Sequence, residues 1–425
     1  MNYSKVNNII GWACFFIATL TYVLTLEPTA SFWDCGEFIA SAYKMQVVHQ
    51  PGAPLFLMIE RFFSLLAMGD KSKIAYFMNF GSAVASGATI LFLFWTITAL
   101  AKKVLIRKAE EITTANLITI MGAGVVGALA YTYSDSFWFS AVEAEVYALS
   151  SLFTAIVFWG ILKWEAVADE PKADRWLLFI AYIMGLSIGI HLLNLLTIPA
   201  IAFVYYFKKT EKPTTPGIFK TLGIGILILA VVQYGIIQYL VSFGAYFDLF
   251  FVNTLGLGFG TGVLFFAVLL IGGLVWGIRY SIKHQKKILN LALLSTVLII
   301  FGYGSFAMII IRAQAKPNLN NSDPDNAFSF LSYLNREQYG DRPLLFGPNY
   351  NSIPKYKDDG SAPVYVETGK SYRKGDTKYE VSGTKTKRIY GENETFPDSI
   401  RRLQHEVLFP RMYSDDQRHV DYYKD

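Results

Sequence analysis

Charged residues are scarce in this chain of 425 residues. Asp, Glu, Lys and Arg together make up 17% of it, against about 25% in an ordinary soluble domain. Apolar residues take their place: 53% of the residues are hydrophobic and 16% are aromatic, and the mean hydropathy is +0.34. This composition excludes a single large soluble core and is typical of a membrane protein.

Cysteine is almost missing as well, and the chain holds only Cys14 and Cys35. Cys14 lies inside the first apolar run and Cys35 lies beyond it. About 20 helical residues cover roughly 30 Å, so the two thiols are expected to lie too far apart to bridge. The sequence therefore excludes a disulfide framework. It also contains no P-loop and no Cys/His zinc pattern.

Long apolar runs fill the first three quarters of the chain. Runs such as GILILAVVQYGIIQYLV are apolar on every face, as a buried helix is, and lack the alternation of barrel strands. We predict an all-α polytopic membrane protein with about nine transmembrane helices. The predicted spans are Ile9 to Leu26, Asn79 to Leu100, Ala115 to Tyr133, Val146 to Trp164, Trp176 to Ile190, Leu192 to Phe207, Ile218 to Leu240, Gly262 to Ile278 and Ile288 to Ile311. The first run has no cleavage site after it and is expected to stay as an anchor.

The formal net charge of +5 does not indicate nucleic-acid binding, because Lys and Arg lie in short loops between the apolar runs. The basic loops are Lys102 to Lys108, Lys163 to Arg175, Lys208 to Lys220 and Arg279 to Lys287. The loops between them, Ser134 to Glu145 and Ser242 to Thr261, contain neither Lys nor Arg. This asymmetry predicts a cytoplasmic N-terminus and places the stretch Pro28 to Pro54 outside.

Residues 176–207 admit two interpretations, one span or a hairpin of two. The segment has basic residues at both ends and is short for two full spans but long for one. The charge pattern favours the hairpin, since a single span would move every later loop to the other side. The residues expected to provide the break are Gly185, Gly189, His191, Asn194 and Pro199. There His191 and Asn194 would either line a cavity or satisfy the broken backbone.

After Ile311 the composition changes to Asn, Asp, Pro, Gly, Lys and Tyr. We therefore expect a transmembrane domain over residues 1–311 and a small mixed soluble segment over residues 312–425. Weak strands are predicted at Arg342 to Phe346, Pro363 to Glu367, Tyr379 to Val381 and Arg388 to Tyr390. The chain ends at YYKD without a natural cap, so this segment is expected to be the start of a larger C-terminal region.

Ionisable residues gather in the stretch Pro28 to Pro54. Asp34 to His49 is predicted as a helix and Leu55 to Ala67 as a second, shorter apolar segment, both at the membrane surface. Ionisable groups beside hydrocarbon have partners or a function. At their spacing of three residues, one of the two carboxylates could deprotonate a hydroxyl nucleophile while the other orients it or steadies a developing positive charge. The alternative is a capping box, in which Asp34 accepts from the first helical N–H groups and Glu37 folds back.

His49 precedes the turn QPGAP, and Arg61 lies inside the second apolar segment. His49 could touch a phosphate or a leaving group, and the Arg61 guanidinium could grip a phosphate with two donors. The alternatives are an interfacial histidine and an arginine that snorkels or pairs locally.

The loop Ser134 to Glu145 carries acidic residues without compensating cations, among them Glu143 and Glu145. On a helix these two would diverge by roughly 200°, whereas an extended segment would put both on one side. Together with Asp34 they could bind Mg²⁺ or Mn²⁺, which take oxygen ligands. The alternative is a solvated helix start.

Four motifs carry a resemblance: FWDCGEFIASAYKMQVVHQPGAPLF, SDSFWFSAVEAEVYALSSLFTAIVFW, ADRWLLFIAYIMGLSIGIHLLNLLTIPA and LSYLNREQYGDRPLLFG. The chain resembles a bacterial family of multi-pass proteins of formerly unknown function. That family is related to an animal endoplasmic-reticulum protein O-mannosyltransferase and to the lipid-dependent glycosyltransferases of the GT-C fold. The resemblance implies an acidic residue in the first outer loop that acts as base or orients the acceptor, matching Asp34 and Glu37, and a second acidic motif at Glu143 and Glu145. The D-x-x-E spacing differs from the adjacent Asp-Glu pair of classical O-mannosyltransferases.

The resemblance also implies a reaction and a location. A sugar, mannose by the family, would pass from a polyprenyl-phosphate donor to Ser or Thr hydroxyls of exported proteins, with Asp34 as base. Arg61, His49 or Arg312 would hold the donor phosphate. The partners would be the lipid-linked donor, the protein acceptor and membrane lipids, and the site would face the periplasm from the bacterial inner membrane. The rival hypotheses are a transporter or flippase with its path at His191 and Asn194, and a membrane scaffold without catalysis.

Overall fold

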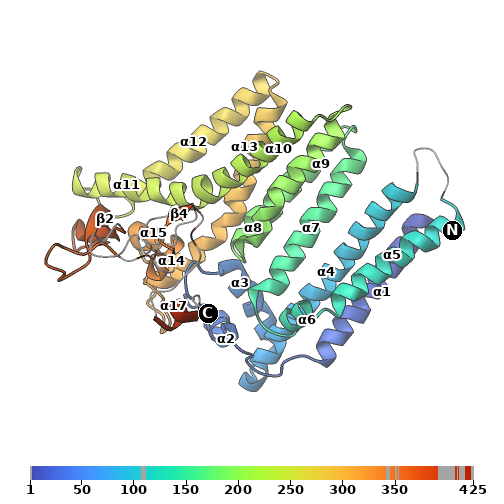
Figure 1. The fold of residues 1–425 in the computed structure, drawn as a ribbon, viewed down its shortest axis with the longest axis horizontal. Coiled ribbons are helices and arrows are strands. Elements are labelled where there is room, and N and C mark those ends of the chain that lie inside the picture. The colour runs from blue at the N-terminus through green and yellow to red at the C-terminus, as the bar shows by residue number, and fades with distance from the viewer. Residues whose placement is uncertain are drawn as a thin grey trace, which may run out of the picture. The chain divides into compact units, whose positions relative to one another are not determined.

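The computed structural model describes residues 2–106, 112–340, 345–349, 352, 354–390, 407–408, 410 and 417–422. Helices dominate (Figure 1), and the strands in this part of the chain all lie after residue 345. This confirms the predicted all-α polytopic fold with a small mixed C-terminal segment. Up to Leu334 the helices are α1 (Tyr3–Leu24), α2 (Cys35–Lys44), α3 (Pro54–Ser64), α4 (Ile74–Leu105), α5 (Thr114–Thr132), α6 (Asp135–Ala141), α7 (Val146–Val167), α8 (Arg175–Ile188), α9 (Ile198–Lys209), α10 (Thr215–Ala230), α11 (Leu240–Asn253), α12 (Thr261–Lys283), α13 (Lys287–Tyr303), α14 (Ala307–Gln314) and α15 (Ala327–Leu334).

Seven helical stretches in the described residues are long and apolar enough to cross a membrane. They are Tyr3–Leu24, Lys71–Leu105, Thr114–Thr132, Val146–Val167, Thr215–Asn253, Thr261–Lys283 and Lys287–Gln314. A π-helical segment, Val231–Tyr239, joins α10 to α11, so this stretch runs for 39 residues and extends past the predicted Leu240. Arg107 and Lys108 of the first basic loop lie outside the described residues.

The other two predicted spans form a hairpin of two short helices, α8 and α9. Both contact α7, and the three run side by side (Figure 1). Lys208 and Lys209 at the end of α9 pair with Asp169 in the loop before α8, each at 3.1 Å. The start of α8 and the end of α9 therefore lie on the same side, as the basic residues at both ends of the segment indicate.

Gly185 does not belong to the break between these helices, contrary to expectation. It lies inside α8, where it contacts Gly302 of α13. A Cβ atom added to Gly302 would clash with the backbone of Gly185. The two backbones touch here because neither residue has a side chain.

The chain divides into two compact units. The membrane unit comprises residues 1–247 and 263–334, and the tail unit comprises residues 248–262 and 335–425. The segment 312–334, which composition groups with the tail, thus belongs to the same unit as the membrane helices.

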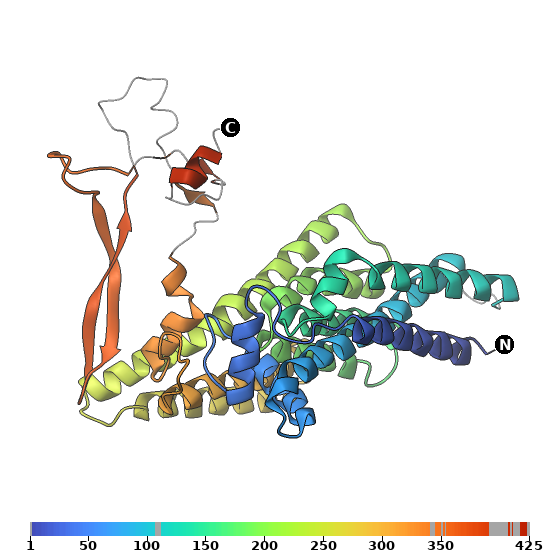
Figure 2. The same ribbon diagram turned by 90° about the horizontal axis from the view of Figure 1, so that it is seen from below.

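The tail unit contains an antiparallel hairpin of β2 (Tyr365–Lys374) and β3 (Tyr379–Arg388), the long pair of strands in Figure 2. The buried Tyr379 anchors it: its hydroxyl donates to Asp248 at 2.6 Å, and the Asn253 side chain bonds its backbone N–H and C=O. Shorter elements are β1 (Phe346–Gly347), β4 (Val407–Leu408) and α17 (Gln417–Tyr422). The predicted strand at Tyr379 is confirmed, whereas residues 342–344 of the first predicted strand lie outside the described residues.

Candidate active site

The loops that follow α1 and α5 meet on one side of the membrane unit. The backbone N–H of Glu27 donates to the carbonyl of Val142 at 3.1 Å. The side-chain amide of Asn79, near the start of α4, donates to the carbonyls of Glu27 and Thr29 at 2.6 and 2.9 Å. The first bond joins the chain that leads into Asp34 to the loop that carries Glu143 and Glu145, and the other two fasten that chain to α4.

Asp34, Glu37 and His49 form a compact cluster at the start of α2. One Glu37 oxygen accepts the backbone N–H of His49, and the other bonds its ring Nδ1, both at 2.8 Å. On the far side of the ring, His49 Nε2 lies 3.8 Å from an Asp34 carboxylate oxygen. Asp34 precedes the helix but makes no side-chain capping bond. The capping box is therefore absent, because Glu37 turns to His49.

The hydrogen bonds between Glu37 and His49 set the charges of the cluster. The bond from Glu37 raises the pKa of His49, against the opposing effect of burial. Burial alone would raise the pKa of Glu37, but the two bonds from His49 outweigh it and the pKa falls. The two residues thus favour a carboxylate beside an imidazolium. The Asp34 side chain is 56% exposed, so its carboxylate is open to a substrate.

Glu145 interacts electrostatically with Asp34 and His49, and Glu143 interacts with Cys35, which lies between Asp34 and Glu37 in the sequence. Glu143 and Glu145 precede α7 in a non-helical turn, which removes the divergence that a helix would impose. Burial raises the pKa of Glu145 to about 7, and the charge of Asp34 adds to the rise. Burial also raises the pKa of the Cys35 thiol, helped by the charges of Glu143 and Glu145. Buried Cys35, to which the sequence assigned no role, thus links the start of α2 to the second acidic motif.

The two arginines predicted to hold phosphate lie at the other end of α2. The Arg61 guanidinium stacks over the Tyr43 ring at 5.0 Å and donates to the Ser64 hydroxyl. Arg312 donates to the carbonyls of Lys44 and Met45, at 3.4 and 2.5 Å, and so caps the helix. Tyr43 comes nine residues after Asp34, which corresponds to about 13 Å along a helix axis. The structure does not gather either guanidinium with Asp34.

His191 and Asn194 occupy the break between α8 and α9. His191 caps a 3-10 turn by accepting the Leu193 N–H, and its ring lies 5.5 Å from that of Tyr147 in the first turn of α7. The break therefore lies at the same end of α7 as Glu145. Asn194 is fully buried, and among the described residues its side-chain amide has no hydrogen-bond partner.

The ligand atoms of Asp34, Glu37 and His49 all lie within 4.8 Å of one another. The Mg²⁺ or Mn²⁺ that the sequence leaves open would therefore find two carboxylates and an imidazole here. Glu143 and Glu145, the oxygen ligands expected from the sequence, lie beside this group and not within it.

Comparison with known proteins gives the site a context. Residues 34–214 match the family model described as the N-terminal domain of protein O-mannosyl-transferase TMEM260, and residues 340–425 match a family of unknown function (DUF8416). Protein O-mannosyl-transferase tmem260 of Dictyostelium discoideum is 24% identical over 198 residues, which cover 45% of this chain and 22% of that protein. The mouse protein O-mannosyl-transferase TMEM260 is 23% identical over 204 residues, covering 48% of this chain and 26% of that protein.

The chain is thus related to this family through a stretch that contains Asp34, Glu37, His49, Glu143 and Glu145. The match spans about a quarter of the length of the relatives. No solved structure matches.

Proposed function

We propose that this protein is a membrane glycosyltransferase that moves a sugar from a polyprenyl-phosphate donor to Ser or Thr hydroxyls of exported proteins. The relatives are named protein O-mannosyl-transferases, so mannose is the first candidate sugar. The observation that carries the proposal is the cluster itself. An open carboxylate, Asp34, stands beside the His49–Glu37 pair, with Glu143 and Glu145 close by.

Asp34 is the residue we assign as base. Both oxygens of Glu37 are taken by His49, and a lowered pKa makes Glu37 a poorer proton acceptor. Asp34 is exposed and free of a capping bond. The acceptor hydroxyl gives its proton to Asp34 while its oxygen attacks the anomeric carbon of the donor. The bond from that carbon to the lipid phosphate breaks, and the phosphate leaves with the electron pair.

His49 is the cation we assign to the departing phosphate. Its imidazolium form is favoured by Glu37, and its Nε2 faces the same space as Asp34. A positive charge placed where negative charge develops lowers the barrier for such a step. Arg61 and Arg312 bind the other end of α2, so among the described residues His49 is the cation that pairs with Asp34.

The outward orientation rests on the charge pattern of the loops. The ion pairs of Lys208 and Lys209 with Asp169 lie where α7 ends, opposite Glu145 at its start. By the positive-inside rule the cluster then faces the periplasm of a bacterial inner membrane, where a lipid-linked donor and an exported acceptor both arrive.

A transporter is the second candidate, because Asn194 offers a buried polar group without a partner among the described residues, in a broken helix. The contact of His191 with Tyr147 favours the transferase. It places the break beside the acidic cluster, at the end of α7 and not at its middle.

The direct test is to reconstitute the protein in vesicles with labelled polyprenyl-phosphate mannose inserted from outside and a Ser/Thr-rich peptide. A transferase moves label into the peptide. Label that crosses the vesicle membrane without entering peptide would support the transporter and contradict the proposal.

A further inference from the structure

The loop that carries His49, residues 45–53 between α2 and α3, makes contacts on two sides. Glu37 binds its backbone N–H and ring. On the opposite side, the segment 312–333, which begins in the last turn of α14, bonds to most residues from Lys44 to Gln50. Because both parts belong to the membrane unit, these contacts join segments about 270 residues apart within one compact body.

Backbone pairing forms the middle of this contact. Val47 donates its N–H to the carbonyl of Leu319 at 3.1 Å and accepts the N–H of Asn321 at 3.2 Å, as in a parallel β-bridge. At one end Arg312 binds the carbonyls of Lys44 and Met45. Farther along, the Gln50 side chain donates to the Ser322 hydroxyl at 2.8 Å.

Tyr333 of α15 makes the contact nearest to His49. Its buried hydroxyl donates to the carbonyl of Val48 at 2.6 Å and lies 3.3 Å from the carbonyl of His49. The chain turns directly beneath it at Gly52, whose φ is +84°. A Cβ atom at Gly52 would lie 2.6 Å from the Tyr333 hydroxyl, so only glycine fits here.

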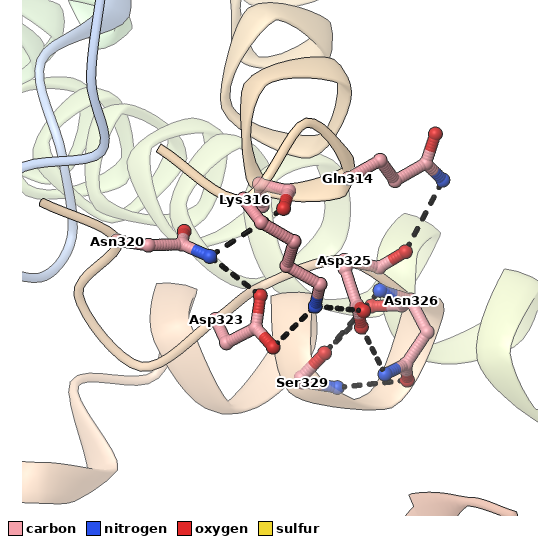
Figure 3. Close-up of polar contacts among 8 residues, drawn as sticks. Gln314, Lys316, Asn320, Asp323, Asp325, Asn326 and Ser329 are labelled. Atoms are coloured by element: carbon pink, nitrogen blue, oxygen red, sulfur yellow. Dashed lines mark hydrogen bonds and ion pairs between the residues drawn. The ribbon is translucent and has the colours of Figure 1, made fainter. Parts of the chain in front are cut away.

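A cluster of polar side chains fixes the part of the segment that pairs with Val47 (Figure 3). Lys316 binds Asp323 and Asp325, at 2.5 and 2.7 Å, and Asn320 donates to Asp323 at 2.6 Å. These bonds close the loop from Lys316 to Asn326, which presents Leu319, Asn321 and Ser322 to the His49 loop.

We propose that residues 312–333 are a clamp that positions His49 for sugar transfer, with Tyr333 as the positioning residue that acts on it most directly. The inference rests on the proposed function for its consequence, but the clamp itself can be tested without any turnover. All of these residues lie outside the stretch 34–214 that matches the family model, so the family relationship does not assign them a role.

The clamp matters because the His49 imidazole must keep one position among several carboxylates. Glu37, Asp34 and Glu145 all act on His49, and the Phe38 ring lies 5.4 Å from it. If the Val48 and His49 carbonyls lose the Tyr333 hydroxyl, the loop gains freedom and His49 leaves Glu37 more often. A displacement of about 1 Å in a catalytic group can cost 10²-fold in rate.

The experiment compares full-length Tyr333→Phe with Tyr22→Phe. Both replace a buried tyrosine whose hydroxyl donates to a backbone carbonyl, but Tyr22 binds Thr132 and packs in a hydrophobic core separate from the one that holds Tyr333 and Val48. Diethylpyrocarbonate modification is followed at one pH by mass spectrometry, with His191 and His284 as internal references. In Tyr333→Phe, His49 is expected to react about two- to tenfold faster, the range that one hydrogen bond gives. In the transfer assay kcat is expected to fall by a similar factor with KM unchanged. Tyr22→Phe should match wild type in both.

Gly52→Ala presses on the Tyr333 hydroxyl from the other side and is expected to shift His49 reactivity in the same direction. Unchanged His49 reactivity in Tyr333→Phe overturns the clamp. An equal rise at His191 and His284 also overturns it, since it would show general loosening. Faster His49 modification with an unchanged kcat overturns the link to transfer. A wild-type protein without transferase activity would contradict the proposed function, while the modification rates would still decide the clamp.

Discussion

Glu37 holds His49 at two points, its backbone N–H and its ring Nδ1, each at 2.8 Å. A single carboxylate thereby fixes both the position of the loop and the orientation of the imidazole. The residues between them form the rest of α2 and the first part of the loop after it. This loop folds back along the helix and brings His49 to Glu37.

Glu37→Gln is expected to reduce stability in a pH-dependent way. The folded pKa of Glu37 lies below its usual 4.5, so its contribution is present above pH 4.5 and is lost as the pH falls through the folded value. The folded pKa of His49 lies above its usual 6.5, so its contribution is full below pH 6.5 and is lost as the pH rises through the folded value. The free energy of unfolding of the wild type should exceed that of the variant most between pH 4.5 and pH 6.5, by about 1.5–3 kcal/mol. Thermal unfolding of both proteins at several pH values checks this. A stability difference that stays constant across the pH range would contradict it.

Glu145→Gln is expected to change the stability profile in the opposite direction. The folded pKa of Glu145 is raised from 4.5 to about 7, so wild-type stability decreases as the pH rises across this interval. The variant has no carboxyl to ionise, so its stability relative to wild type should increase between about pH 5 and about pH 8. Unfolding curves at these two values measure the gain. If the stability difference between variant and wild type is the same at both pH values, Glu145 does not have the raised pKa that its buried environment gives it.

Gly302→Ala is expected to destabilise the contact between α8 and α13. Its Cβ would clash with the Gly185 backbone, and such overpacking typically costs about 1–3 kcal/mol. Gly272→Ala in α12 is the matched control, because an added Cβ there meets nothing within 4 Å. Thermal melts of the two variants in the same detergent should separate clearly, and equal midpoints would refute the close approach of the two backbones.

Asn253→Ala is expected to loosen the tail hairpin without affecting the membrane helices. It removes both side-chain bonds to the backbone of Tyr379, leaving the hydroxyl bond to Asp248. A hairpin of two strands has little stability of its own. Hydrogen exchange should therefore speed up across Tyr365–Lys374 and Tyr379–Arg388. Unchanged protection there would show that the anchor lies elsewhere.

Local patterns in the sequence predict the parts of the fold that local physics decides. Apolar run length locates the spans, and the basic residues around 176–207 indicate the hairpin that Asp169 closes. The same patterns do not reveal the partner of Glu37. D-x-x-E before an apolar helix has the form of a capping box, and only the returning loop supplies His49.

Contacts between distant segments are the part that no local pattern shows. From the sequence alone, Gly185 is interpreted as a helix breaker. The structure shows that it allows close contact with Gly302, more than a hundred residues later. Composition ends the transmembrane domain at Ile311, yet Tyr333 is buried against the His49 loop. Arg312 caps α2, a role that its position at the end of a span does not reveal.

The central claim is that Asp34 is the base, and Asp34→Asn tests it most directly. Asparagine keeps the size of the side chain but cannot take a proton, so transfer of labelled mannose to peptide should fall about 10²–10⁴-fold. Asp70→Asn, which changes an exposed acidic residue in the same outer loop, should retain wild-type activity. Both variants should insert and melt like wild type. Full transfer by a folded Asp34→Asn protein would contradict the account.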